Sequence, residues 1–306
     1  MAPPREPHPH PSRPTTYEDL LAEGSSVPTE GWDFSWFEGR ATEARPSWGY
    51  AVAMAERLGR ARAVLDVQTG GGEVLDFALA RVAGADTGES TGASTGEPIR
   101  AGTGDAAGAD TRLTTGAPAP KPPLLTLATE GWPPNVAKAT ALLRPRGVGV
   151  VAAAEDAPLP FADGAFDLVV SRHPVRPQWD EIARVLQPGG TYFAQHVGPS
   201  SVFELVEYFL GPQPDEVRGA RHPERERADA EAAGLDVVGL RAERLRMEFH
   251  DIGAVVHFLR KVVWMVPGFT VEAYEPQLRE LHERIQTEGP FVAHSARHLF
   301  DARKPG

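Results

Sequence analysis

Residues 63–75 contain a short apolar run, a glycine turn and the apparent start of a helix. The run Ala-Val-Leu-Asp-Val includes Asp66, and the turn that follows holds Gly70, Gly71 and Gly72. A buried strand, a tight glycine turn and a helix N-terminus together form the opening unit of nucleotide-binding α/β folds. This unit predicts a parallel sheet that binds its ligand at the carboxyl ends of the strands.

The turn departs from the dinucleotide-binding pattern G-x-G-x-x-G. Gly70 and Gly72 supply the first two glycines, but Leu75 stands at the third position. In that pattern the third glycine lets helix and strand pack closely below a pyrophosphate. An acid that ends the strand, with glycines at every second residue, instead suits a cofactor that has a cationic amino-acid end and no phosphate. S-adenosylmethionine is such a molecule.

Composition excludes several other classes of protein. The 306 residues are 41% hydrophobic and include no cysteine, which leaves out disulfides, thiolate metal sites and cysteine nucleophiles. We expect no metal site. No apolar run approaches the ~20 residues that span a bilayer, and the N-terminus lacks the apolar region of a secretory signal. We therefore expect a cytoplasmic protein with no membrane partner.

The formal net charge of −11 disfavours nucleic acid as a partner, because binding usually needs a clustered basic face. Arginines gather between Arg218 and Arg227, but Glu216, Glu224 and Glu226 alternate with them. This mixture is typical of a solvated helix face.

Two stretches differ in composition from the rest of the chain. Residues 1–31 are rich in proline and poor in apolar residues, and we expect a disordered tail. Residues 84–123 are rich in Gly, Ser, Thr and Pro, with no hydrophobic period. The strand and helix before this stretch are too small to fold alone, so an insertion in a surface loop explains it better than an interdomain linker. Residues 32–306 are then one domain.

Without that insertion, short apolar strands alternate with helices, which predicts a parallel sheet with right-handed crossovers. The expected strands are 63–67, 124–128, 148–153, 166–171 and 191–197, then an extended segment 237–249 and a last strand 296–302. The expected helices between them are 48–58, 73–82, 134–143, 178–186 and 202–210.

Near the C-terminus a helical segment, 251–290, separates the last two strands. Asp251 is placed to cap a helix whose apolar residues recur at helical spacing, and Pro267-Gly268 ends it. A second helix follows over about 275–286. Two interpretations remain open: the first helix covers the sheet as part of the core, or the segment forms a lid.

Together these motifs resemble the class I S-adenosylmethionine-dependent methyltransferases. The family's first motif, acid-x-Gly-x-Gly-x-Gly, stands here as Asp66, Gln68, Gly70 and Gly72, with glutamine at the first glycine. The family pattern Leu-Pro-Phe, a turn and Phe-Asp-Leu-Val occurs at 159–169. The resemblance implies a Rossmann-like α/β sandwich with a mostly parallel seven-stranded sheet and a helical insertion before the last strand.

The resemblance also implies the residues that bind the cofactor. Glu130, at the end of the second strand, corresponds to the acid that accepts hydrogen bonds from the ribose hydroxyls. Glu155, with Asp156 as the alternative, corresponds to the acid that accepts from the adenine amino group. The full set of candidate cofactor-binding residues is Asp66, Gln68, Thr69, Gly70, Gly72, Glu130, Gly131, Glu155, Asp156 and Ser171.

The resemblance narrows further to a bacterial subgroup of type 11 methyltransferases, partly on Ser171-Arg172-His173 and Gln195-His196-Val197. We expect a small organic acceptor, with His173 and His196 as candidate general bases if the acceptor loses a proton. Two alternatives stay open. One is an RNA-base methyltransferase, and the other is a catalytically inactive S-adenosylmethionine-binding protein, which Gln68 suggests. The sequence leaves the oligomeric state and the acceptor atom open.

Overall fold

A computed structural model describes residues 16–29, 34–84 and 121–306 of the chain. These residues belong to two compact units, Met1–Thr29 with Phe249–Phe291, and Glu30–Glu248 with Val292–Gly306. The predicted insertion 251–290 coincides with the second part of the smaller unit. The predicted loop insertion 84–123 lies mostly outside the described residues, as do residues 1–15 of the predicted tail.

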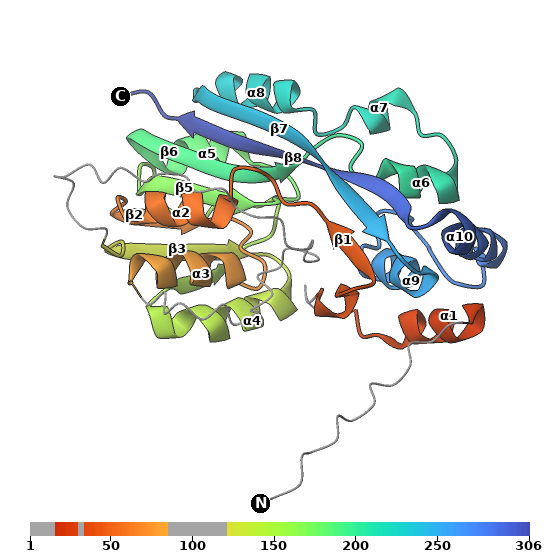
Figure 1. Cartoon of the computed structure of the whole chain (residues 1–306). Helices are drawn as coiled ribbons and strands as arrows, with labels where there is room; N and C mark the ends of the chain where they lie inside the picture. Colours follow the sequence, from red (N-terminus) through yellow and green to blue (C-terminus); the bar gives the residue numbers. More distant parts are fainter. Residues whose placement is uncertain (1–15, 30–33, 85–120) are drawn as a thin grey trace, which may run out of the picture. The chain divides into compact units, whose positions relative to one another are not determined.

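The larger unit is built on an eight-stranded sheet with the strand order β1-β7-β8-β6-β5-β2-β3-β4 (Figure 1). The neighbours from β6 through β4 pair in parallel, whereas β8 runs antiparallel to β6. This confirms the predicted Rossmann-like, mostly parallel sheet. The strands are β1 (Ala41–Glu43), β2 (Ala63–Asp66), β3 (Leu125–Glu130), β4 (Gly149–Ala152), β5 (Phe166–Arg172), β6 (Leu186–Val197), β7 (Asp236–Phe249) and β8 (Phe291–Arg303).

The sheet has one strand more than the seven expected, because β1 adds to its edge beside β7. The backbone N–H of Ala44 donates to the carbonyl of Arg246 over 2.8 Å at this junction. A strand of three residues is too short to show the alternation of buried and exposed residues that identifies strands in a sequence.

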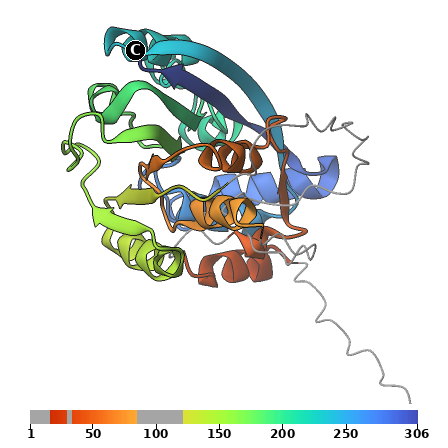
Figure 2. The ribbon, with the colours of Figure 1, turned by 90° about the vertical axis from the view of Figure 1, so that its left-hand side faces the viewer.

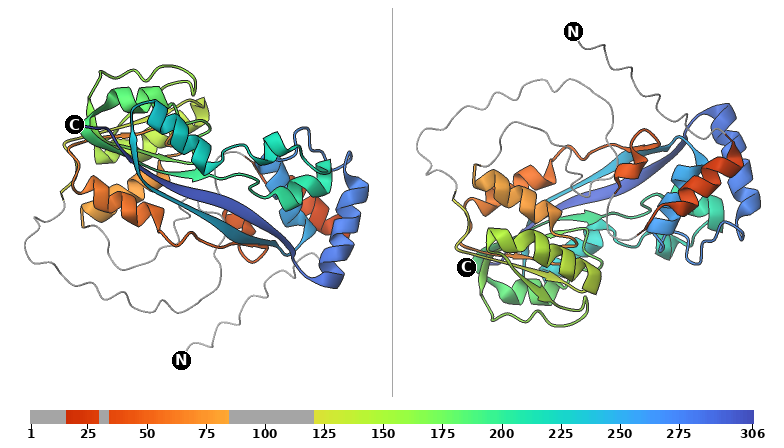
Figure 3. Two further views of the ribbon diagram at one scale, coloured as in Figure 1. Left: turned by 90° about the horizontal axis from the view of Figure 1, so that it is seen from above. Right: turned by 90° about the horizontal axis from the view of Figure 1, so that it is seen from below.

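Helices cover both faces of the sheet (Figures 2 and 3). One face is covered by α2 (Tyr50–Leu58), α3 (Glu73–Val82) and α4 (Pro133–Leu143). These helices bury Met54, Leu75 and Leu143 against Val64 and Phe193 of the sheet. On the other face, α5 (Trp179–Val185) and α8 (Pro223–Ala232) bury Ile182 and Ala230 against Leu65, Tyr192 and Phe300. Strand β2 is thus apolar on both sides, as parallel strands between two helical layers are.

The register of the central strands brings their carboxyl ends together. Asp66, the last residue of β2, pairs with Ala128 of β3 and with Val170 of β5. Residues that follow these partners therefore lie at the same edge of the sheet, where open α/β sheets bind ligands. Glu130 ends β3 at this edge, and Arg172 ends β5.

The prediction of disorder over residues 1–31 is wrong for Tyr17–Ser26, which form helix α1 in the smaller unit. Thr16 caps this helix, since its Oγ1 accepts from the backbone N–H of Asp19. Apolar residues are few here, but helix α9 (Ile252–Lys261) supplies the surface that α1 packs on. Gly24 makes the close approach possible, because a Cβ there would lie 2.4 Å from the carbonyl oxygen of Gly253.

The rest of the smaller unit follows the sequence pattern with one difference: α9 ends at Lys261 and not, as predicted, at Pro267. Asp251 caps α9 as predicted, with its Oδ1 accepting from the N–H of Ala254 over 2.8 Å. Helix α10 spans Glu275–Glu288. In the larger unit, the remaining helices are η1 (Ser35–Phe37), η2 (Arg144–Arg146), α6 (Phe203–Leu210) and α7 (Asp215–Arg218). Within the described ranges, none of the helices combines the length and apolar character that crossing a bilayer demands.

Candidate functional site

The turn between β2 and α3 has left-handed backbone at three positions. They are Gln68 (φ 58°), Gly70 (φ 64°) and Gly72 (φ 86°). Gly72 precedes α3, and a Cβ there would lie 2.9 Å from the side chain of Leu143, so the glycine also allows α3 and α4 to approach. At Gly70, apart from the residue itself and its two chain neighbours, no described residue has a heavy atom within 4 Å of the position a Cβ would take. The backbone of Gly70 therefore borders open space.

Two buried carboxyl groups stand beside this turn. Asp66 is 5% exposed, and its Oδ2 accepts from Thr69 Oγ1 over 2.6 Å. Glu130 is 7% exposed, and its Oε2 accepts from the backbone N–H of Gly70 over 2.7 Å. Its Oε1 accepts from the N–H groups of Gly131 and Trp132 over 3.1 and 3.0 Å. These bonds orient the Glu130 carboxylate and use both lone pairs of Oε1 and one of Oε2, so Oε2 keeps one acceptor position for a ligand.

The two carboxyl groups make this edge of the sheet electronegative. The pKa of Asp66 is raised from its usual 3.8 to about 7, chiefly by burial. The hydrogen bond from Thr69 lowers this pKa, and the negative charge of Glu130 raises it. A raised pKa means that the ionised form of Asp66 lacks stabilisation in the ligand-free protein. A cationic ligand next to Asp66 would stabilise this ionised form.

The side chain of Gln68 is engaged with the loop that follows β5. Its Oε1 accepts from the N–H of Val175 over 2.7 Å, and its Nε2 donates to the carbonyl of Arg176 over 3.3 Å. The backbone N–H of Gln68 donates to Thr129 Oγ1 over 3.3 Å. Gln68 therefore connects the glycine turn to two neighbouring strand ends.

The other candidate residues for the adenosine end lie around Gly131. Glu155 and Asp156 are exposed in the turn after β4. A Cβ on Gly131 would lie 3.0 Å from the carbonyl oxygen of Ala153 and 3.6 Å from Cγ of Glu155, so the Glu155 side chain lies against Gly131. The structure thus brings Glu130, Gly131 and Glu155 together.

Ser171 and His173 extend the site at the end of β5. Ser171 is buried, and its Oγ donates to the carbonyl of Val67 over 2.7 Å, next to the glycine turn. His173 has a left-handed backbone (φ 55°), and its N–H donates to the carbonyl of Gln195 over 2.7 Å. Both residues therefore lie at the same edge of the sheet as Asp66 and Glu130.

The hydrogen bonds of Gln195 define the state of the His173 ring. Trp48 Nε1 can only donate, and it lies 2.7 Å from Gln195 Oε1. Gln195 Nε2 then donates to His173 Nε2 over 2.8 Å, which leaves the His173 proton on Nδ1. Burial lowers the pKa of His173 well below 6.5, and the charges of Arg172 and Arg297 lower it further. His173 is neutral, with its Nε2 lone pair already in use.

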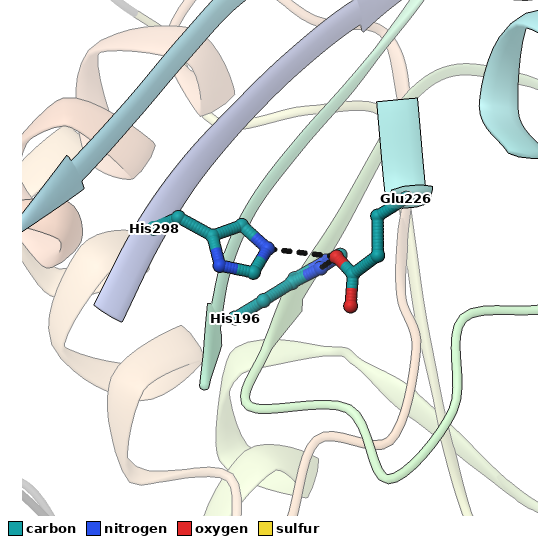
Figure 4. Close-up of side chains that lie close together, drawn as sticks. All are labelled: His196, Glu226 and His298. Carbon is teal, nitrogen blue, oxygen red and sulfur yellow. Dashed lines mark hydrogen bonds and ion pairs between the residues drawn. The ribbon is translucent and has the colours of Figure 1, made fainter. Parts of the chain in front are cut away.

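His196 lies on the opposite face of the sheet from Gln195, within a buried network (Figure 4). Its Nδ1 lies 2.5 Å from Glu226 Oε2, and its Nε2 lies 2.9 Å from Tyr192 Oη. His298, its cross-strand partner on β8, places Nε2 2.7 Å from the same oxygen of Glu226. Both ring nitrogens of His196 are engaged and the ring is 2% exposed, which favours a structural role.

His196, Glu226 and His298 are also a donor set that suits a metal ion, with ligand atoms within 4.8 Å of one another. The two histidines already satisfy Glu226 by hydrogen bonding, however. Burial raises the pKa of Glu226, but the bonds to His196 and His298 outweigh burial and lower it to about 2. His298 Nδ1 has no hydrogen-bond partner in the part of the chain that the structure describes, whereas a histidine that ligates a metal usually donates its second N–H.

Sequence reasoning did not find several residues that the structure places here. Arg297 and His298 carry no motif of their own, and Gln195 was noted only within the motif Gln195-His196-Val197. Glu226 lies on a strongly polar helix in which only it and Ala230 are buried. Gln195 and His196 are consecutive residues of a strand, so their side chains point to opposite faces of the sheet. This alternation could have predicted that only one of the two lies at the candidate site.

A model of the methyltransferase domain family matches residues 113–194. The match confirms the resemblance inferred from the motifs, and it begins after the glycine turn. No curated protein matches the sequence.

Solved structures of similar fold include several methyltransferases. A putative methyltransferase from Bacillus halodurans is 18% identical with a TM-score of 0.49, covering 83% of this chain and 99% of that one. A putative sarcosine dimethylglycine methyltransferase from Galdieria sulphuraria is 16% identical with a TM-score of 0.43, covering 83% and 82%. A phosphoethanolamine N-methyltransferase from Haemonchus contortus, solved with S-adenosylhomocysteine, is 16% identical with a TM-score of 0.42, covering 85% and 53%.

Proposed function

We propose, on the premise that this chain resembles the class I methyltransferases, that it transfers a methyl group from S-adenosylmethionine to a small organic acceptor. The observation that carries the proposal is the pair of buried carboxyl groups, Asp66 and Glu130, on either side of the open backbone at Gly70. When bound, S-adenosylmethionine would supply an electrophilic methyl group on a sulfonium.

The residues at this edge suit that cofactor. The Glu130 carboxylate is oriented by three backbone N–H groups, and Oε2 retains one acceptor position for a ribose hydroxyl. A second hydroxyl would bind by displacing one of the N–H groups from Oε1. Asp66 favours a cationic neighbour, and the amino-acid end of the cofactor carries an ammonium group that could lie beside it. Gly70 leaves room for a ligand to approach the backbone. We assign Glu155 to the adenine end, since its side chain lies against Gly131.

On the acceptor side, the chain mainly has to align the reacting atoms and exclude water. His173 is the candidate that lies at this edge of the sheet, and His196 faces the other side. The Nε2 lone pair of His173 accepts from Gln195, so we assign His173 a donor role through Nδ1–H. General-base action would require that this hydrogen bond be released.

Isothermal titration with S-adenosylmethionine and with S-adenosylhomocysteine tests the cofactor assignment. We expect both to bind, and an absence of binding would refute the proposal. A labelled-methyl assay against a metabolite library then tests transfer. The second candidate, a binding protein without catalysis, is favoured by Gln68 at a position where the family has glycine. It predicts cofactor binding with no labelled product from any acceptor.

A further inference from the structure

Helix α1 and residues 269–272, which lie between α9 and α10, border a cavity within the smaller unit. Its volume is about 530 Å³, which falls within the range of about 300–1,000 Å³ that is typical of small-molecule sites. Both walls belong to the same compact unit, in which α1 packs directly on α9 (Figure 1). The cavity therefore has room for a small organic ligand.

The walls of this cavity are mainly apolar. Helix α1 contributes Leu21 and Ala22, and the opposite wall contributes Phe269 and Val271. The Phe269 ring stacks on Tyr274, with 5.6 Å between the ring centroids and 16° between the ring planes. A second aromatic side chain thus supports this wall. Apolar walls of this kind take up the apolar part of a ligand.

The guanidinium group of Arg260, on α9, also lines the cavity. Its Nη1 donates to the carbonyls of Gly24 and Val27 over 2.9 and 3.0 Å, at the C-terminal end of α1. These two bonds orient the group, and they leave the N–H donors of Nε and Nη2 available. Among the described residues, no carboxylate forms an ion pair with Arg260. The cavity therefore presents an oriented cation that lacks an anionic partner.

Two carboxylates line the same cavity. Glu272 is exposed, and within the described part of the chain it has neither a hydrogen bond nor an ion pair. Glu18, on α1, contacts Arg279 over 3.5 Å, and Arg279 lies closer to Glu275, at 2.8 Å. The cavity thus carries a positive group, Arg260, and a negative group, Glu272, that do not pair with each other. A ligand with both charges would complement both groups.

We propose that this cavity binds a free α-amino acid with an apolar side chain. The carboxylate of the amino acid accepts from Nε and Nη2 of Arg260, since a guanidinium group binds a carboxylate through paired N–H donors. Its ammonium group lies beside Glu272, and its side chain lies against Leu21, Phe269 and Val271. The inference does not depend on the proposed function, because every residue in it belongs to the smaller unit.

Isothermal titration of small probes into the full chain tests this assignment. The probes are leucine and phenylalanine, their analogues without the carboxylate (isoamylamine and phenethylamine), and their analogues without the ammonium group (isocaproate and hydrocinnamate). We expect at least one amino acid to bind, and both of its singly charged analogues to bind at least about tenfold more weakly. Failure of both amino acids to bind, or equal binding by a singly charged analogue, would overturn the assignment.

Substitutions locate the binding. Glu272→Gln and Arg260→Gln should each weaken amino-acid binding about tenfold or more, and Glu280→Gln should stay within about twofold of the unmodified protein. Glu280 is the matched control, because it is exposed on α10 and does not line the cavity. Arg260 also binds the end of α1, so melting temperature shows whether Arg260→Gln folds, and Glu272→Gln decides if it does not.

The same titrations are repeated with saturating S-adenosylhomocysteine, which is expected to occupy the site at the glycine turn. Amino-acid binding should persist. Its loss would place the amino acid at the glycine turn and overturn the assignment, as would equal effects of Glu272→Gln and Glu280→Gln.

Discussion

The backbone N–H of Gly70 donates to Glu130 Oε2 over 2.7 Å, which connects the glycine turn after β2 to the end of β3. Two more backbone N–H groups hold the other oxygen of the same carboxylate. The Glu130 side chain is therefore oriented before a ligand binds, and little side-chain entropy is lost on binding.

Replacing Glu130 with alanine should weaken S-adenosylhomocysteine binding by roughly 1.5–3 kcal/mol, or about ten- to a hundredfold. The substitution removes a charged acceptor and also releases the N–H of Gly70. Isothermal titration measures the effect. Glu56→Ala, on the exposed side of α2, serves as the control and should leave affinity unchanged. An unaltered dissociation constant for Glu130→Ala would reject the ribose assignment.

Replacing Gln68 with glycine should keep cofactor affinity or tighten it by up to about 1 kcal/mol. Gln68 has a φ of 58°, a strained backbone conformation for any residue with a Cβ. Its side-chain amide contacts Val175 and Arg176 and is not aimed at the open space over Gly70. Parallel titrations of both proteins decide the matter, and a tenfold weaker variant would show that the side chain holds the cofactor.

Stability should depend on the ionisation of Asp66. Its pKa in the folded protein, about 7, lies above the usual 3.8, so its contribution to stability is complete below pH 3.8 and is lost as the pH rises to 7. Asp66→Asn, which cannot ionise, should gain stability relative to the unmodified ligand-free protein over this range and keep the gain above it. One pKa unit corresponds to about 1.4 kcal/mol. Urea unfolding from pH 4 to pH 8 measures the gap, and a gap independent of pH would contradict the assignment.

Replacing Glu226 with glutamine should lower the free energy of unfolding by about 2–4 kcal/mol, because two buried histidines lose a charged acceptor. The pKa of Glu226 is about 2, below its usual 4.5, so this stabilisation is present above pH 4.5 and is lost as the pH falls through 2. Urea unfolding at neutral pH measures the loss. Glu231→Gln, exposed on the same helix, is the control. Unchanged stability, or a selective loss of S-adenosylhomocysteine binding, would argue against a structural network.

Much of the fold follows from local patterns. Helix α3 begins at Glu73 and ends at Val82 as predicted, and β2 and β5 differ from the prediction by one residue each. Asp66, Glu130 and Ser171 could be placed at one edge of the sheet from sequence, because parallel strands bring their carboxyl ends together. That inference needs only the period of each segment and the order of the strands.

Local patterns did not predict three features: the helix α1, the strand β1, and the network of His196, Glu226 and His298. Each depends on a partner far away in the chain: α1 on α9, β1 on β7, and His196 on residues 226 and 298. Strand β1 is too short to show a hydrophobic period, and α1 buries only three large side chains, Tyr17, Leu20 and Leu21, so the burial of both elements is decided by the surfaces they meet. The sequence alone determined the sheet and the edge at which we propose that its ligand binds. Only tertiary packing decided which polar side chains gather there and which are buried behind it, because hydrogen bonds between distant residues form after the core has brought them together.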